Sequence, residues 1–185
     1  MSGRDDQARE QTTPQEGSIL PESRLQLTEH EFDVIELAAL RGRAHEMAAL
    51  VEQRGIRLPA LGRVTVSGEQ IAVCFRPERW LLLMPPAIAR AAEWHAACRG
   101  LGVAIDLSCG LSTLQLAGPG PAIRAALARG CRLDLDPQVF PVGHTAATII
   151  AQVSVVLASL ADGMLLLTPS TTARHVREWL GEHMT

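Results

Sequence analysis

Residues 81–90 read LLLMPPAIAR, and residues 165–174, 84 positions later, read LLLTPSTTAR. The two stretches share three leucines, a proline and an Ala-Arg pair at the same offsets. A short run of leucines is typical of a strand that is buried on both faces, and proline is tolerated in the first turn of a helix. The repeat therefore predicts a buried strand, a proline turn and a helix in each half of the chain.

The flanking sequence extends this pattern outward. In the first half, strands are predicted at 32–40, 63–66, 70–75 and 80–84, with helices at 43–54 and 86–99. In the second half, strands are predicted at 103–107, 112–117, 145–152, 153–160 and 164–168, with helices at 121–129 and 171–183. We predict an α+β fold: two pseudo-duplicated ferredoxin-like units, residues 29–101 and 102–185, packed as one body.

The first 28 residues differ from the rest of the sequence. They are rich in Gln, Glu, Ser, Thr and Pro and show no periodicity, which predicts a flexible N-terminal tail over residues 1–28. They contain no apolar stretch typical of a signal peptide, and no apolar run elsewhere is long enough to span a bilayer. We therefore expect a cytoplasmic protein.

Composition excludes several classes of function. Among 185 residues there are 17 basic and 20 acidic side chains, so the net charge of −3 argues against a polybasic nucleic-acid binder. Every basic residue apart from histidine is Arg, and there is no Tyr. A chain without Lys and Tyr has no amine for a Schiff base and no phenolic proton donor.

The remaining reactive side chains form no recognisable constellation. The four cysteines, Cys74, Cys98, Cys109 and Cys131, contain no C-x-x-C pair, and the six histidines contain no pair at zinc-binding helical spacing. Cys109 lies on a predicted turn and is the candidate for an exposed thiol. His144 lies in a loop, where we favour a local hydrogen bond. The three tryptophans, Trp80, Trp94 and Trp179, are expected in the core.

Two loops deserve comparison with known chemistry. Asp134 and Asp136 could act as paired carboxylates, but their alternation with leucine favours a turn with one buried face. Residues 118–121 read GPGP between a strand and a helix, as a phosphate loop would. Because proline lacks the N–H that a phosphate loop must present, a rigid turn at the start of the helix is favoured.

Three stretches carry a family resemblance. Residues 106–119 have the form D-L-S-x-G-x-S-x-L-x-L-x-G-P. Residues 130–137 read GCRLDLDP and are followed by FPVG at 140–143 and by Thr148. A third stretch comprises Leu58-Pro59 and residues 77–82. Over about residues 32–183 the sequence resembles the gamma subunit of heterotetrameric sarcosine oxidase.

The resemblance implies a role within a larger assembly. Such enzymes oxidise an N-methyl amine and transfer the one-carbon unit to tetrahydrofolate, with FAD, FMN, NAD and zinc held by other subunits. The gamma subunit resembles the folate-binding aminomethyltransferases in fold. The resemblance implies a non-catalytic structural subunit that packs against alpha, beta and delta subunits. No catalytic, cofactor-binding or metal-binding residue is expected in this chain.

Arg124, Arg129 and Arg132 flank the GCRLDLDP stretch, and we expect this region to contact a partner chain, because Arg is favoured at interfaces. Two alternatives stay open. The first is a stand-alone folate or small-ligand binding module with a polar pocket between its halves. The second is a cysteine-dependent transferase that acts through Cys109.

Overall fold

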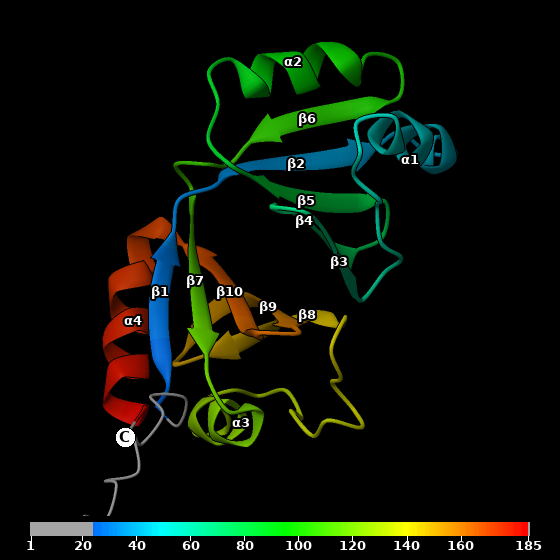
Figure 1. The fold of residues 1–185 in the computed structure, drawn as a ribbon. Helices are drawn as coiled ribbons and strands as arrows, with labels where there is room; N and C mark the ends of the chain where they lie inside the picture. Colours follow the sequence, from blue (N-terminus) through cyan, green and yellow to red (C-terminus); the bar gives the residue numbers. More distant parts are fainter. Residues whose placement is uncertain (1–23, 185) are drawn as a thin grey trace, which may run out of the picture.

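The computed structural model describes residues 24–184 and contains two five-stranded antiparallel sheets (Figure 1). The strands of the first sheet are, in spatial order, β3 (Arg63–Ser67), β4 (Gln70–Arg76), β5 (Arg79–Met84), β2 (Asp33–Ala39) and β6 (Gly102–Asp106). Those of the second sheet are β8 (Thr145–Ile150), β9 (Val153–Leu160), β10 (Gly163–Pro169), β7 (Leu111–Ala117) and β1 (Gln26–His30). The helices are α1 (Ala44–Glu52), α2 (Arg90–Ala97), α3 (Gly120–Ala128) and α4 (Ser170–His183).

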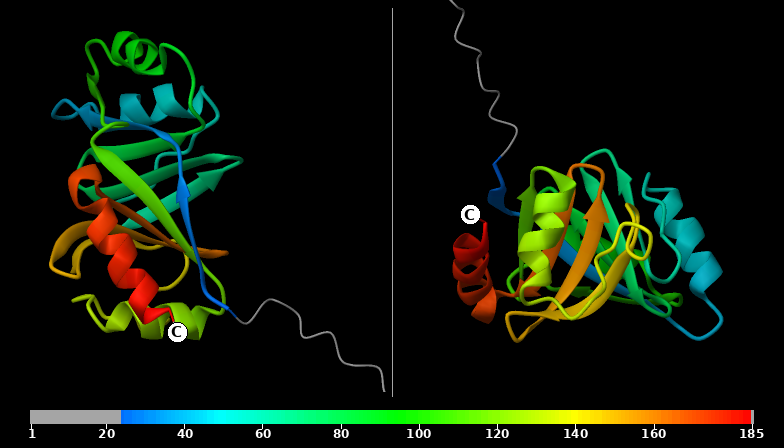
Figure 2. Two further views of the ribbon diagram at one scale, coloured as in Figure 1. Left: turned by 90° about the vertical axis from the view of Figure 1, so that its left-hand side faces the viewer. Right: turned by 90° about the horizontal axis from the view of Figure 1, so that it is seen from below.

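The two sheets repeat the same arrangement of elements. The series β2, α1, β3, β4, β5 and α2 corresponds to the series β7, α3, β8, β9, β10 and α4, and the strands take the same spatial order in both sheets. Helices α1 and α2 cover the outer side of the first sheet, and α3 and α4 cover that of the second (Figures 1 and 2). Each sheet has five strands, whereas a ferredoxin-like unit has four.

The fifth strand of each sheet crosses the expected boundaries. Strand β6 follows α2 and pairs with β2, so Gly102–Asp106 belongs to the first sheet and not to the second half in which we expected it. Strand β1 takes the equivalent edge of the second sheet beside β7, although it precedes β2 in the sequence (Figure 1). Its first residues, Gln26–Thr28, lie within the expected flexible tail, and that part of the prediction was wrong. Residues 1–23 of the tail lie outside the described residues.

The leucine repeat explains how the sheets pack. Leu81 and Leu83 of β5 and Leu165 and Leu167 of β10 share one buried cluster between the two sheets. The leucines between them point the other way: Leu82 packs under α1 and α2, and Leu166 packs under α3 and α4. Side chains alternate along a strand, so three consecutive leucines fill both faces at once.

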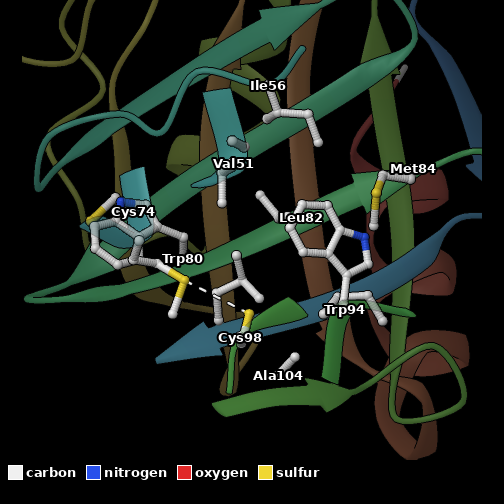
Figure 3. Close-up of a cluster of buried hydrophobic side chains, with 13 residues drawn as sticks. Val51, Ile56, Cys74, Trp80, Leu82, Met84, Trp94, Cys98 and Ala104 are labelled. Carbon is white, nitrogen blue, oxygen red and sulfur yellow. Dashed lines mark hydrogen bonds between the residues drawn. The ribbon is translucent and has the colours of Figure 1, made fainter. Parts of the chain in front are cut away.

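The core beneath α1 and α2 contains two of the three tryptophans (Figure 3). Trp80 and Trp94 are 7% and 5% exposed, as expected, and Trp80 Nε1 donates a hydrogen bond of 2.9 Å to the carbonyl of Pro59. Helix α2 begins at Arg90, later than the predicted residue 86, because Ala89 adopts a left-handed conformation with φ of 62°. Such a residue cannot continue a right-handed helix.

Candidate functional site

The loop at residues 130–143, called here the signature loop, is held by Arg124 of α3. Arg124 Nη1 donates hydrogen bonds to the carbonyl oxygens of Leu135 and Phe140, the second at 3.0 Å. Leu135 and Phe140 are both buried and pack beneath α3 and α4. The guanidinium of Arg124 therefore makes its hydrogen bonds within this chain, and these bonds hold two points of the loop against helix α3.

The two aspartates of the signature loop shape its backbone. Asp134 accepts a hydrogen bond from the backbone N–H of Asp136 at 2.9 Å, and Asp136 accepts one from Gln138 at 2.8 Å. Each carboxylate thus closes a turn two residues ahead of itself, as Asp does in an Asx turn. This confirms the favoured interpretation of a turn.

Arg129 and Arg132 are exposed at the start of the signature loop. Within residues 24–184, neither guanidinium makes an ion pair or hydrogen bond. Between them lies Gly130, where a Cβ atom would stand 2.6 Å from Cζ2 of Trp179 on α4. The structure thus separates the three predicted arginines: Arg124 faces the loop, whereas the other two keep free donors at the surface.

The D-L-S-x-G stretch connects the two sheets. Asp106 Oδ1 accepts hydrogen bonds from the backbone N–H of Ser108 at 2.9 Å and from its hydroxyl at 2.6 Å. Both bonds lower the pKa of the Asp106 carboxyl, and the bond from the Ser108 hydroxyl has the larger effect. Ser108 Oγ in turn accepts the N–H of Val34 at 3.0 Å, which ties the connection back to β2. This motif has a structural role in the passage from β6 to β7.

A second contact joins the sheets at His144. Its Nδ1 lies 2.9 Å from Arg63 Nη1, and the main chains meet where Val64 N–H bonds to the carbonyl of Gly143 at 3.0 Å. Because a guanidinium only donates, Nδ1 acts as the acceptor in this arrangement. The expected hydrogen bond of His144 is present, but its side-chain partner lies 81 positions away in the sequence and not nearby.

The four cysteines differ in their exposure, and the half-buried Cys131 has its Sγ 3.8 Å from Thr148 Oγ1. Cys74 and Cys98 are buried, and burial raises the pKa of both thiols, which disfavours the reactive thiolate. Cys109 is exposed, as expected, but in the described part of the chain no hydrogen bond to its thiol is formed. Its carbonyl accepts the hydroxyl of Ser170 at 2.7 Å, at the start of α4.

Within residues 24–184, no group of three or more His, Cys, Asp or Glu side chains lies close enough together to hold a metal ion. No helix in this range is long and apolar enough to cross a membrane. Residues 118–121 form the turn into α3, which begins at Gly120 and has Pro119 as its N-cap.

One cleft lies between the two sheets. It has a volume of about 590 Å³ and is lined by the β1–β2 connection, the β3–β4 and β9–β10 turns, and Pro85 and Pro86. Its acidic residues, Glu31, Glu69 and Asp162, come from three separate segments. The sequence does not single them out, because each is an ordinary polar residue of a turn or connection and only the tertiary structure brings them to one rim.

The fold and its sites define a class: an α+β protein with two facing antiparallel sheets and the fold of an aminomethyltransferase. The glycine cleavage system aminomethyltransferase T from Bartonella henselae has this fold, with a TM-score of 0.61 and 18% identity over 85% of this chain and 45% of that one. A chain of the heterotetrameric sarcosine oxidase from Corynebacterium sp. U-96 aligns with a TM-score of 0.76 and 28% identity, over 90% of this chain and 86% of that one.

Sequence comparison identifies the family. Residues 41–183 match the model of the sarcosine oxidase gamma subunit family. The sarcosine oxidase gamma subunits of Arthrobacter sp. and Corynebacterium sp. (strain P-1) are 33% and 32% identical to this chain over 142 residues, which is 75% of this chain and 69% of each relative. The chain belongs to the sarcosine oxidase gamma subunit family.

Proposed function

We propose that this chain is the non-catalytic gamma subunit of a heterotetrameric sarcosine oxidase-type complex. The complex would oxidatively demethylate an N-methyl amine and pass the one-carbon unit to tetrahydrofolate. Alpha, beta and delta subunits would supply FAD, FMN, NAD and zinc, and the assembly would be cytoplasmic. The observation that carries the proposal is the similarity, along 90% of this chain, to a chain of a heterotetrameric sarcosine oxidase.

The roles of the family-like residues support a structural subunit. Asp106 and Ser108 fix the connection between the sheets, and Arg124 fixes the signature loop. Gly130 leaves room for the ring of Trp179. Each of these residues makes its contacts within this chain and stabilises the fold. We therefore expect a partner subunit to bind the surface whose shape these residues maintain.

We assign Arg129 and Arg132 to a partner interface. Both are exposed, and within the described residues both guanidinium groups have free donors. Permanent subunit interfaces bury more than about 2,000 Å², and Arg is enriched in them because its fork pairs with carboxylates. The double charge reversal Arg129→Glu and Arg132→Glu should weaken assembly; an intact complex with this variant would contradict the assignment.

Purification of the tagged full chain from its native host tests the proposed function. We expect three further chains to co-purify in equal amounts, together with the visible absorbance of a flavin. A single colourless chain that is folded and monomeric would contradict the proposal.

The cleft between the sheets favours one alternative, a stand-alone folate or small-ligand module. Its volume of about 590 Å³ falls within the range of small-molecule sites. Titration of the full chain with tetrahydrofolate separates the two functions. A stoichiometric complex formed without other subunits would support the module, and no binding would remove it.

A further inference from the structure

The cleft between the sheets has an apolar floor that continues the inter-sheet core. Phe32 and Leu160 pack against the cluster of buried side chains between the sheets and also line the cleft. Val66, at the end of β3, lines it too and is 58% exposed, although valine is usually buried. The core therefore opens to solvent at this end.

The rim of the cleft carries uncompensated negative charge. Glu31, Glu69 and Asp162 line it, and no arginine of the described residues pairs with any of them. The neutral Gln115 donates to Asp162 at 2.9 Å. Five other carboxylates of the described residues have an arginine partner, but several more, such as Glu93 and Glu182, have none. What marks this rim is that three unpaired carboxylates from separate segments line one cleft.

His30 also lines the cleft. It lies at the end of β1, and its buried Nε2 has no hydrogen-bond partner within the described structure. This nitrogen is shielded from solvent, so it is not part of the surface that the cleft presents. The cleft surface combines apolar side chains with three carboxylates.

We propose that this cleft receives a basic segment of a partner subunit, with an Arg or Lys side chain flanked by apolar residues. This inference rests on the proposed function. The aliphatic stem of such a side chain would pack on Phe32 and Val66 while its charged head meets Glu31 and Glu69. An apolar or acidic segment does not fit, because burying the carboxylates without a cation is costly.

The double substitution Glu31→Gln and Glu69→Gln tests the proposal in the assembled complex. Each substitution keeps the shape of the side chain and removes its charge. At low salt we expect the tagged full chain to dissociate from its partners about tenfold faster, about threefold for each charge. The difference should shrink at high salt, because salt screens partly exposed ion pairs. Val66→Arg, which places a cation in the cleft from this chain itself, should also speed dissociation.

The matched control is Glu93→Gln with Glu182→Gln, which removes the same charge from α2 and α4, outside this cleft. Equal dissociation rates for the two double variants and the wild type would overturn the inference and leave the proposed function standing. A wild-type chain that recovers no partners would overturn both.

A small organic cation is the competing occupant, and butylguanidinium serves as its probe. We expect no effect of butylguanidinium on the thermal unfolding midpoint of the free full chain. A midpoint that rises with butylguanidinium in the wild type and not in the Glu31→Gln, Glu69→Gln variant, with unchanged dissociation of the complex, would overturn the inference in favour of a ligand pocket.

Discussion

Arg124 is predicted to stabilise the fold by holding the signature loop, independently of any partner. The substitution Arg124→Ala removes two partly buried hydrogen bonds, to the carbonyl oxygens of Leu135 and Phe140. A hydrogen bond that involves a charged group contributes about 1.5 kcal/mol or slightly less when its acceptors remain partly hydrated. We therefore expect the free energy of unfolding to fall by about 2–3 kcal/mol.

Urea and thermal unfolding of the full chain, followed by tryptophan fluorescence, measure this loss. For a chain of this size the thermal midpoint should fall by about 5–10 °C. Arg124→Lys keeps the charge but not the planar fork, so it should lose about half as much. Arg129→Ala is the matched control: its exposed side chain has no partner in the described structure, and we expect a change within about 0.5 kcal/mol. Equal losses for Arg124→Ala and Arg129→Ala would refute the reasoning.

Three further substitutions test other parts of the fold. Gly130→Ala should destabilise the chain by about 1–3 kcal/mol in urea unfolding, because the new methyl group meets the ring of Trp179 at 2.6 Å; an unchanged midpoint would show that the ring moves aside. Because Ser108 lowers the pKa of Asp106, the ionised carboxylate stabilises the fold above its ordinary pKa of 3.8, and this contribution is lost as pH falls below that value. Asp106→Asn should therefore be less stable than the wild type at neutral pH, with the gap narrowing in acid; a gap that is constant with pH would contradict this. Trp80→Phe removes a hydrogen bond to a main-chain carbonyl and should cost about 1 kcal/mol, which calorimetry would detect.

The sequence alone predicted most helices and strands, because their side chains follow the periods of helix and strand. The leucine repeat also predicted the duplication, since both faces of β5 and β10 must be buried. Strand β1 was missed because Gln26–His30 contains one apolar residue and no alternation. Its pairing partner, β7, begins 85 positions after Gln26, so no local sequence pattern indicates that the two strands pair.

The residues of the candidate site likewise include some whose roles could be predicted from the sequence and some whose roles could not. The turn roles of Asp134 and Asp136 could be predicted because each bonds to a backbone N–H two residues ahead. The internal role of Arg124 could not, because its carbonyl partners lie 11 and 16 residues further along a loop whose path depends on the packing of Leu135 and Phe140.

What the sequence by itself determined is the set of elements, their duplication and the family resemblance, all of which depend on residue type and spacing. Only the tertiary structure decided which sheet receives β1 and β6, and which of the three predicted arginines keep free donors at the surface. It alone also brought Glu31, Glu69 and Asp162 to one rim. The physical reason is that edge pairing and side-chain convergence depend on contacts between segments far apart in the chain, which local periodicity does not encode.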